Sequence, residues 1–290
     1  MEKHFENKPV QAQESMEKGS NVQILLKFIR HGERDLDGRL TDHGRKVTRQ
    51  RAEDSDITGS DFDAVKAIGS DAGESSGAGA RALETADIYT KELAGDEAFN
   101  TRVESILNYE TLKSEMPFDY KEVYNSHIPE NFGELSDEDK AIASKNAQTN
   151  TVKHLMDLET PEAVAFRKES AGAFAKVVVH YCKLAKRLNP DSKVLIPAGA
   201  HGGTMEMLLH EALVVEEDGE TKPYALTGEF SPSEAYNVDI QTDDNSELKE
   251  LRVTFDNPER DTPDDLYIDI DKVRELAEFY DDMHEENNDQ

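Results

Sequence analysis

The chain has little cysteine, no long apolar run and a shortage of basic side chains. Its single cysteine, Cys182, excludes a disulfide framework or a cysteine-based zinc site within one chain, and it suits a reducing compartment. No stretch of about 18 uncharged apolar residues could span a membrane, and the charged N-terminus lacks the apolar segment of a signal peptide. These absences predict a soluble, cytoplasmic protein.

The shortage of positive charge limits the kinds of partner. Lys and Arg total 33 against 62 Asp and Glu, which gives a formal net charge of −29. Bulk attraction to nucleic acid or to an anionic membrane is therefore not expected, and a phosphate site would have to be a local basic pocket. Solubility explains the acidic excess, although a surface adapted to high salt would have the same composition.

The polar ends and the patterned interior of the chain predict one α/β domain over residues 21–280. Residues 1–20 and the acidic residues 281–290 lack apolar periodicity and are predicted to be disordered tails. The length of 290 residues is sufficient for a substantial core. Within the domain, residues 112–160 are irregular and rich in aromatic and polar side chains, which favours an insertion or lid over a site.

Strand and helix patterns alternate along this domain. Residues 22–29 (VQILLKFI) are almost continuously apolar, as expected for a strand covered on both faces, and Thr41 is a candidate N-cap for a helix that ends near residue 52. The other expected strands are 62–68, 193–198, 235–241 and 248–255, and the other expected helices are 81–93 and 160–188, one from Thr204 and one from residues 262–263. This order predicts a three-layer α/β sandwich with a mostly parallel sheet.

Two histidines follow strands of this predicted sheet. Arg30 and His31 come directly after the first strand, and His201 comes after the strand that begins at Lys193. Because ligands bind at the carboxyl ends of parallel strands, we expect both histidines at one edge of the sheet.

The residues at this edge suit phosphoryl transfer, which needs a nucleophile, cations and an acid for the leaving group. His31 is held rigidly after a buried strand and is the candidate nucleophile. Arg30 and Arg81 can each bind phosphate oxygens bidentately, and their charges disfavour protonation of His31. His201 lies at a helix N-terminus, which favours an anion, and a cationic His201 would stabilise the phosphoryl group.

Four motifs, in order along the chain, resemble those of the histidine phosphatase (phosphoglycerate-mutase-like) superfamily. They are Arg30-His31-Gly32-Glu33, Leu40-Thr41-Asp42-His43-Gly44, Arg81-Ala82-Leu83-Glu84-Thr85-Ala86 and His201-Gly202-Gly203. Glycine after the second histidine resembles the branch of the family whose proton donor comes from a loop after the third strand.

The resemblance implies a covalent phosphohistidine on His31, in a phosphate pocket formed by Arg30, Arg81, His201 and Gly202. It implies no metal and no cofactor. Glu110 best matches the position of the family's proton donor, and Glu104 is the second choice.

Departures from the family pattern affect the predicted function. Ser70-Asp71 stands where the family has Ser-Pro, which leaves one wall of the pocket undefined. Glu33-Arg34 replaces the residues that follow Arg-His-Gly in phosphoglycerate mutases, so a phosphatase is favoured over a mutase. Arg34 is either a further phosphate contact or an exposed surface arginine.

The sequence therefore predicts a metal-independent phosphatase that hydrolyses a small phosphomonoester or a phosphoprotein through His31. The alternatives are phosphoryl transfer of the mutase type and a catalytically silent phosphate- or phosphoprotein-binding module. The substrate and the oligomeric state have no readable signature. His210-Glu211 lacks the second histidine of a zinc-protease helix, and the Gly-rich loop at 73–79 lacks the Lys-Ser/Thr ending of a P-loop, so neither a metal nor a nucleotide is expected.

Overall fold

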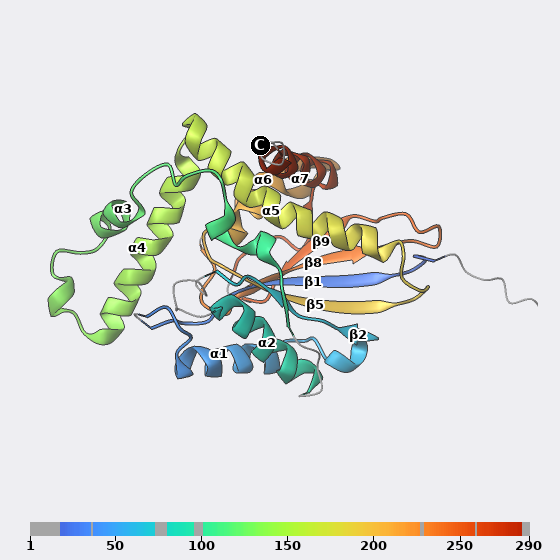
Figure 1. The fold of residues 1–290 in the computed structure, drawn as a ribbon, viewed down its shortest axis with the longest axis horizontal. Helices are drawn as coiled ribbons and strands as arrows, with labels where there is room; N and C mark the ends of the chain where they lie inside the picture. The colour runs from blue at the N-terminus through green and yellow to red at the C-terminus, as the bar shows by residue number, and fades with distance from the viewer. Residues whose placement is uncertain are drawn as a thin grey trace, which may run out of the picture.

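A computed structural model describes residues 18–35, 37–72, 80–95, 101–226, 229–258 and 260–285. These residues form one mixed sheet covered by helices on both faces, an α/β sandwich of three layers (Figure 1). The strands are β1 (Gln23–Arg30), β2 (Ala64–Val65), β3 (Ile68–Gly69), β4 (Arg102–Val103), β5 (Lys193–Ala200), β6 (Leu213–Glu217), β7 (Glu220–Pro223), β8 (Ala235–Gln241), β9 (Leu251–Phe255) and β10 (Leu266–Ile268). The α-helices are α1 (Asp42–Glu53), α2 (Arg81–Ala94), α3 (Tyr120–Ser126), α4 (Asp137–Asp157), α5 (Pro161–Ala185), α6 (Met205–Ala212) and α7 (Ile270–Glu285).

The ten-stranded sheet has a parallel half and an antiparallel half. Its order is β4-β3-β5-β1-β8-β9-β10-β6-β7, and β2 also pairs with β5. β1 pairs in parallel with β5 and antiparallel with β8, so it lies where the two halves join. Most strands run in the direction of β1, which confirms the predicted α/β fold. In the other half of the sheet, each strand pairs antiparallel with its neighbour in the order β8-β9-β10-β6-β7.

The helices divide between the two faces of the sheet. α1 and α2 cover one face, α5, α6 and α7 cover the other, and α3 and α4 project beyond one end of the sheet (Figure 1). Gly199 allows α2 to lie directly on β5, because a Cβ atom at this position would be 1.9 Å from the carbonyl oxygen of Ala82. A side chain at residue 199 would therefore push α2, and Arg81 with it, away from the sheet.

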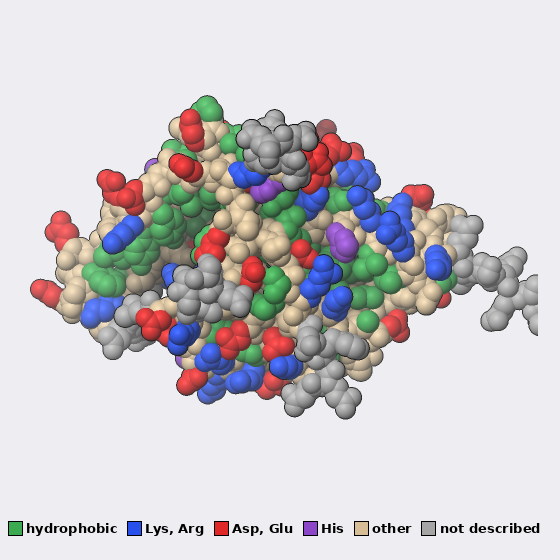
Figure 2. Space-filling view, in the orientation of Figure 1, with side chains coloured by type: hydrophobic (Ala, Val, Ile, Leu, Met, Phe, Trp, Pro, Cys, Tyr) green, Lys and Arg blue, Asp and Glu red, His purple; other side chains and the backbone are tan. Residues whose placement is uncertain are grey.

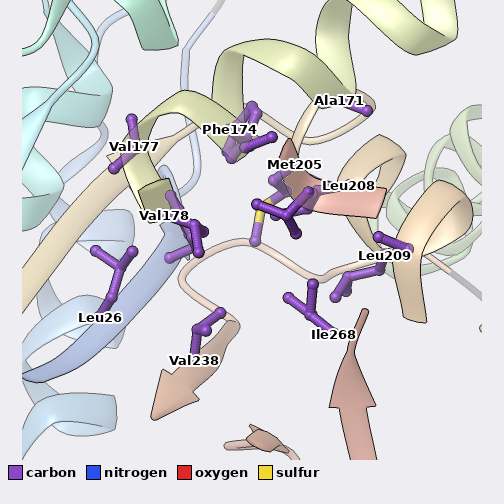
Figure 3. Close-up of a cluster of buried hydrophobic side chains, with 14 of the residues drawn as sticks. Leu26, Ala171, Phe174, Val177, Val178, Met205, Leu208, Leu209, Val238 and Ile268 are labelled. Carbon is purple, nitrogen blue, oxygen red and sulfur yellow. The ribbon is translucent and has the colours of Figure 1, made fainter. Parts of the chain in front are cut away.

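The main core lies between the sheet and the pair α5 and α6 (Figure 3). Apolar residues at three- and four-residue spacing on α5, such as Phe174 and Val178, pack against Leu26 of β1 and Leu208 of α6. Burying one such side chain contributes roughly 1.5–3 kcal/mol to folding, so this core fixes the position of β1. A smaller cluster that includes Ile29 and Tyr89 lies on the α1 and α2 face.

Several sequence predictions agree with these elements. Thr41 caps α1, and Thr160 caps α5, each accepting a hydrogen bond from the backbone three residues on. The strand predicted over residues 235–241 is β8, and it pairs with β9 as the expected hairpin.

Other predictions need correction. The insertion predicted to be irregular contains the 21-residue helix α4, whose buried apolar side chains form only a narrow stripe (Ala147, Val152 and Leu155) and therefore give a weak periodic signal. The strand predicted over residues 62–68 is split into β2 and β3. The last helix begins at Ile270 instead of residue 262, and it continues to Glu285, past the predicted domain end at residue 280. The N-terminal segment 1–17, the Gly-rich loop 73–79 and residues 286–290 lie outside the described residues.

Lys27 interrupts the apolar character of β1. Its side chain is fully buried, and its ammonium nitrogen lies 2.5 Å from Asp256 Oδ2 and donates to Asn237 Oδ1 at 3.2 Å. Burial lowers the pKa of Lys27, and the nearby Asp256 carboxylate opposes that change. The pair places an ionic contact inside the layer between the sheet and α2.

Removal of Asp256 is expected to destabilise the fold. In Asp256→Ala the buried ammonium loses its counter-charge, so the free energy of unfolding should fall by about 3 kcal/mol. Replacing both residues, in Lys27→Met/Asp256→Ala, removes the buried charge and should restore most of that loss. Urea denaturation of the three proteins measures the difference, and a double variant no more stable than Asp256→Ala would contradict this explanation.

No helix in the described part of the chain combines the length and the apolar character needed to cross a membrane.

Candidate active site

The carboxyl ends of β1 and β5 lie side by side and bring the two candidate histidines together. Arg30 is paired with Ala200 in the parallel register, and the His31 backbone N–H donates to the Ala200 carbonyl at 2.9 Å. The imidazole rings of His31 and His201 are 5.2 Å apart between centroids, at an interplanar angle of 61°. Both rings line a cleft of about 990 Å³, and Arg30, Arg81 and Gly202 line the same cleft.

The environment of His31 exposes one ring nitrogen to the cleft as a base. Its Nδ1 lies 2.7 Å from the Gly32 carbonyl oxygen, which can only accept, so Nδ1 carries the hydrogen and Nε2 keeps its lone pair. Burial, followed by the charge of Arg81, lowers the pKa of His31 to about 3. His31 is therefore neutral at ordinary pH, which is the state that a nitrogen nucleophile requires.

α2 holds the loop that carries His31. The Gly32 backbone N–H donates to Thr85 Oγ1 at 3.0 Å, and Thr85 lies one helical turn after Arg81 on the same face of α2. The helix thus fixes the position of the candidate nucleophile and of Arg81 together.

His201 is held by Ser70. The Ser70 hydroxyl accepts from the Ala72 backbone N–H at 3.1 Å, so its own hydrogen can be donated to His201 Nε2, 3.1 Å away. This pattern favours a hydrogen on Nδ1, which is buried and has no partner among the described residues. Burial, followed by His31 and Arg81, holds the pKa of His201 well below its ordinary value. The expected cationic His201 is therefore not the form that this environment favours.

Arg30 and Arg81 are both almost completely buried, which is unusual for arginine. Arg30 is fixed by Glu229, at 2.9 Å from Nη1, and by a hydrogen bond to the Phe230 carbonyl. The Nε atoms of Arg30 and Arg81 are buried and lack a partner among the described residues.

Gly202 allows Arg30 to lie against the backbone that follows His201. A Cβ atom at residue 202 would be 2.6 Å from Arg30 Nε. Glycine at this position is thus explained by the close approach of the guanidinium group.

Arg30 Nε, Arg81 Nε and His201 Nδ1 are buried nitrogens without a partner among the described residues. Their residues lie near His31, because the charges of Arg30 and Arg81 act on its pKa and the His201 ring lies 5.2 Å from its ring. A buried donor that lacks an acceptor costs about 1–3 kcal/mol, so such groups are usually explained by a ligand or a role in catalysis. Two of the three belong to guanidinium groups, which match the oxygens of a phosphate. The arrangement can hold a phosphoryl group next to the lone pair on His31 Nε2.

The structure does not bring the predicted proton donor into this group. Glu110 is exposed on the short 3₁₀ helix Tyr109–Thr111, and neither Glu110 nor Glu104 lines the cleft, whereas Tyr109 does. The only carboxylate in the wall, as far as the described residues go, is Glu33. The geometry thus gives no support to Glu110 or to Glu104 as the donor.

Sequence reasoning missed two carboxylates that position the site. Glu229 pairs with Arg30, and burial raises the pKa of Glu229 to about 7, against the effect of Arg30. Glu206 accepts from the backbone N–H groups of Gly203 and Phe230, and so ties the loop after His201 to the segment that holds Arg30. Glu206 could have been noticed in the sequence, because a glutamate inside an otherwise apolar helix is unusual. No sequence pattern around Glu229 indicates that it is buried.

Arg34 is exposed, as expected for a surface arginine, and it also lines the cleft. Its charge contributes to the lowered pKa of both His31 and His201. Within the described residues no group of three or more His, Cys, Asp or Glu side chains could hold a metal ion.

Comparisons with known proteins give distant structural matches. No family model matches the sequence, and no curated protein matches it. A structure described as mycobacterial hydrolase 2 has 15% identity and a TM-score of 0.39, covering 89% of this chain and 98% of that one. A mycobacterial glucosyl-3-phosphoglycerate phosphatase has 16% identity and a TM-score of 0.36, covering 80% and 96%. A phytase of Klebsiella sp. ASR1 has 11% identity and a TM-score of 0.40, covering 93% and 97%. At these values the similarity carries no function over to this chain.

Proposed function

We propose that this chain is a phosphomonoesterase that uses His31 as its nucleophile and needs no metal. The proposal depends on one observation: Arg30, Arg81 and His201 line one cleft with a neutral His31, and each has a buried nitrogen that lacks a partner among the described residues. The positive charges of the two arginines stabilise the negative charge that is spread over the phosphoryl oxygens, which is the role that a metal ion has in other phosphatases. Three of the four motifs that resemble the histidine phosphatase superfamily contain these four residues.

The reaction has two steps in this proposal. The lone pair on His31 Nε2 attacks phosphorus, the ester P–O bond breaks, and the leaving alkoxide takes a proton from an acid. Water then gives a proton to the conjugate base of that acid and attacks phosphorus, the P–N bond breaks and inorganic phosphate leaves, which restores both the acid and the lone pair on Nε2. Arg30 and Arg81 bind the equatorial oxygens in both steps, and the Nδ1–H group of His201 donates to one of them.

The proton donor is proposed at two positions. Glu110 follows from the resemblance in sequence, and Glu33 follows from its position in the cleft wall. Glu110→Gln and Glu33→Gln distinguish them, because removal of the true donor slows alkyl phosphates far more than aryl phosphates, whose leaving groups need little protonation.

The first test of this function is turnover of p-nitrophenyl phosphate in the presence of a chelator. We expect release of one inorganic phosphate for each phenol, with undiminished rate after dialysis against EDTA. Saturable binding of inorganic phosphate without any turnover would instead favour the silent binding module. Turnover that is lost on chelation and restored by a divalent cation would contradict the proposed metal independence.

A further inference from the structure

We infer that the substrate is a small phosphomonoester whose organic group is bulky and apolar, held between the phosphate site and a wall formed by residues 116–124 and helix α4. This inference rests on the proposed function, and it names the class of substrate for the same site.

The size of the cleft leaves room for an organic group much larger than the phosphoryl group itself. Its volume of about 990 Å³ lies near the upper end of the roughly 300–1,000 Å³ that is usual for sites of drug-sized ligands. A phosphoryl group bound at Arg30 and Arg81 fills only the floor of this space. The remainder must accept the alcohol part of the ester.

The wall above the phosphate site is predominantly apolar. Met116, Phe118 and Tyr124 line it from one side. From α4 the buried Val152 and Leu155 line it together with the polar residues Ser144, Lys145, Gln148 and Thr151. Figure 2 shows a hollow on the left of the molecule, with hydrophobic side chains along α4 beside it. Large apolar side chains that stay partly exposed around a basic floor indicate a ligand with one charged end and one apolar end.

Exposed apolar side chains concentrate at this wall. Among the described residues, the large hydrophobic side chains that remain exposed are Val103, Tyr109, Met116, Tyr120 and Ile142. Tyr109, Met116 and Tyr120 line the cleft. Most of the exposed large apolar surface is therefore continuous with the phosphate site.

The wall is fixed in place by specific contacts. The buried Glu169 carboxylate accepts from the backbone N–H groups of Lys113 and Ser114, at 2.6 and 2.7 Å, which anchors the segment that leads to Met116. Phe118 packs edge-on against His154 of α4, with ring centroids 5.0 Å apart. A preformed apolar surface binds an apolar group without the cost of ordering a loop.

Charge adds a second criterion. Arg34, Arg51 and Lys145 line the cleft with Arg30 and Arg81, and Glu33 is the only acidic lining residue within the described chain. The protein as a whole has a formal charge of −29, so these positive side chains, with Lys145 on the α4 wall, favour an anion in the cleft against the overall field. A phosphate dianion with an apolar group satisfies the floor and the wall together.

The test compares esters with the same kind of leaving group. 2-(1-Naphthyl)ethyl phosphate and ethyl phosphate both release a primary alcohol, and glucose 6-phosphate adds a bulky polar comparator. From the transfer of a naphthyl-sized group out of water, we expect kcat/KM for the naphthylethyl ester to exceed that for ethyl phosphate roughly 10- to 100-fold. Glucose 6-phosphate should be no better than ethyl phosphate.

Variants of the wall provide the matched control. Met116→Ser and Tyr124→Ser should each lower the preference for naphthylethyl over ethyl phosphate by about 3- to 10-fold. Ile142→Ser removes an apolar side chain that is 52% exposed on α4 and lies outside the cleft wall, so it should leave that ratio unchanged. Circular dichroism and the unfolding midpoint of each variant establish that it is folded.

Each outcome decides the inference. Equal kcat/KM values for the three esters, or a preference for glucose 6-phosphate, would overturn the apolar class while leaving the phosphatase function intact. If no ester is hydrolysed, the proposed function fails. Calorimetry with the corresponding phosphonates then still tests the apolar class of ligand, and equal affinity for naphthylethyl- and ethylphosphonate would overturn the inference. Self-association that Met116→Ser abolishes would show that a second copy covers the wall, and it would overturn the inference as well.

Discussion

His31→Ala is expected to lower kcat/KM for an aryl phosphate by about 10⁴-fold or more, because loss of a covalent nucleophile removes the only two-step route through the site. His31 Nε2 is the one ring nitrogen in the cleft that carries an unused lone pair next to the buried donors of Arg30 and Arg81. Alanine leaves those donors in place, so phosphate binding should persist. Steady-state phosphate release and phosphate titration by calorimetry measure the two effects separately.

A second histidine provides the control for this experiment. His180 is exposed on α5 and lies outside the cleft wall, so His180→Ala should retain the wild-type kcat/KM. The unfolding midpoint of His31→Ala should remain close to that of the wild type. Activity within tenfold of the wild type in a folded His31→Ala protein would remove the nucleophile assignment.

Arg81→Ala is expected to lower kcat/KM by about 10²- to 10³-fold, since it removes one of the two buried arginines of the cleft that, in the proposed reaction, bind the phosphoryl oxygens. Arg81→Lys keeps the charge but loses the planar pair of donors, so it should recover only part of that loss. Arg274→Ala, on the exposed surface of α7, is the matched control and should have no effect.

The same variant has a pH signature. Burial is the largest cause of the low pKa of His31, about 3, and Arg81 is the next. Removal of Arg81 should therefore raise the pKa of His31, although burial keeps it below its ordinary value of about 6.5. A protonated imidazole is not a nucleophile, so activity is lost as the pH falls through this pKa. The acid limb of kcat/KM in Arg81→Ala should move to higher pH than in the wild type, and an unshifted or lowered limb would contradict the electrostatic argument.

The sequence predicted those parts of the fold that short-range patterns determine. Thr41 was identifiable as an N-cap, and residue 160 as the start of a helix, because the signals at a helix start are followed at once by the helix itself. β1 and β5 were identifiable because long apolar runs of strand length are typical of strands buried on both faces. β2, β3 and β10 are two or three residues long, and their strand conformation depends on neighbours that are distant in sequence.

The candidate site was predictable where residues follow these strands. His31 and His201 lie at the ends of β1 and β5, and the parallel pairing of the two strands brings their rings together. Glu229 was not predictable, because its contact with Arg30 joins residues 199 positions apart and depends on the chain reversal before β8. The choice of Glu110 as proton donor stays a prediction, because a loop position inferred from sequence order does not determine where its side chain points.

The central claim is that the phosphoryl group passes to Nε2 of His31. We would quench the wild-type protein with alkali within milliseconds of mixing with a ³²P-labelled aryl phosphate, digest it and map the label, then identify the phosphorylated nitrogen by ³¹P–¹⁵N correlation. Because Nδ1 is engaged by the Gly32 carbonyl, the account predicts acid-labile, alkali-stable label on Nε2 of His31. Label on Nδ1, on His201 or on another residue, or turnover with no labelled protein at any quench time, would contradict it.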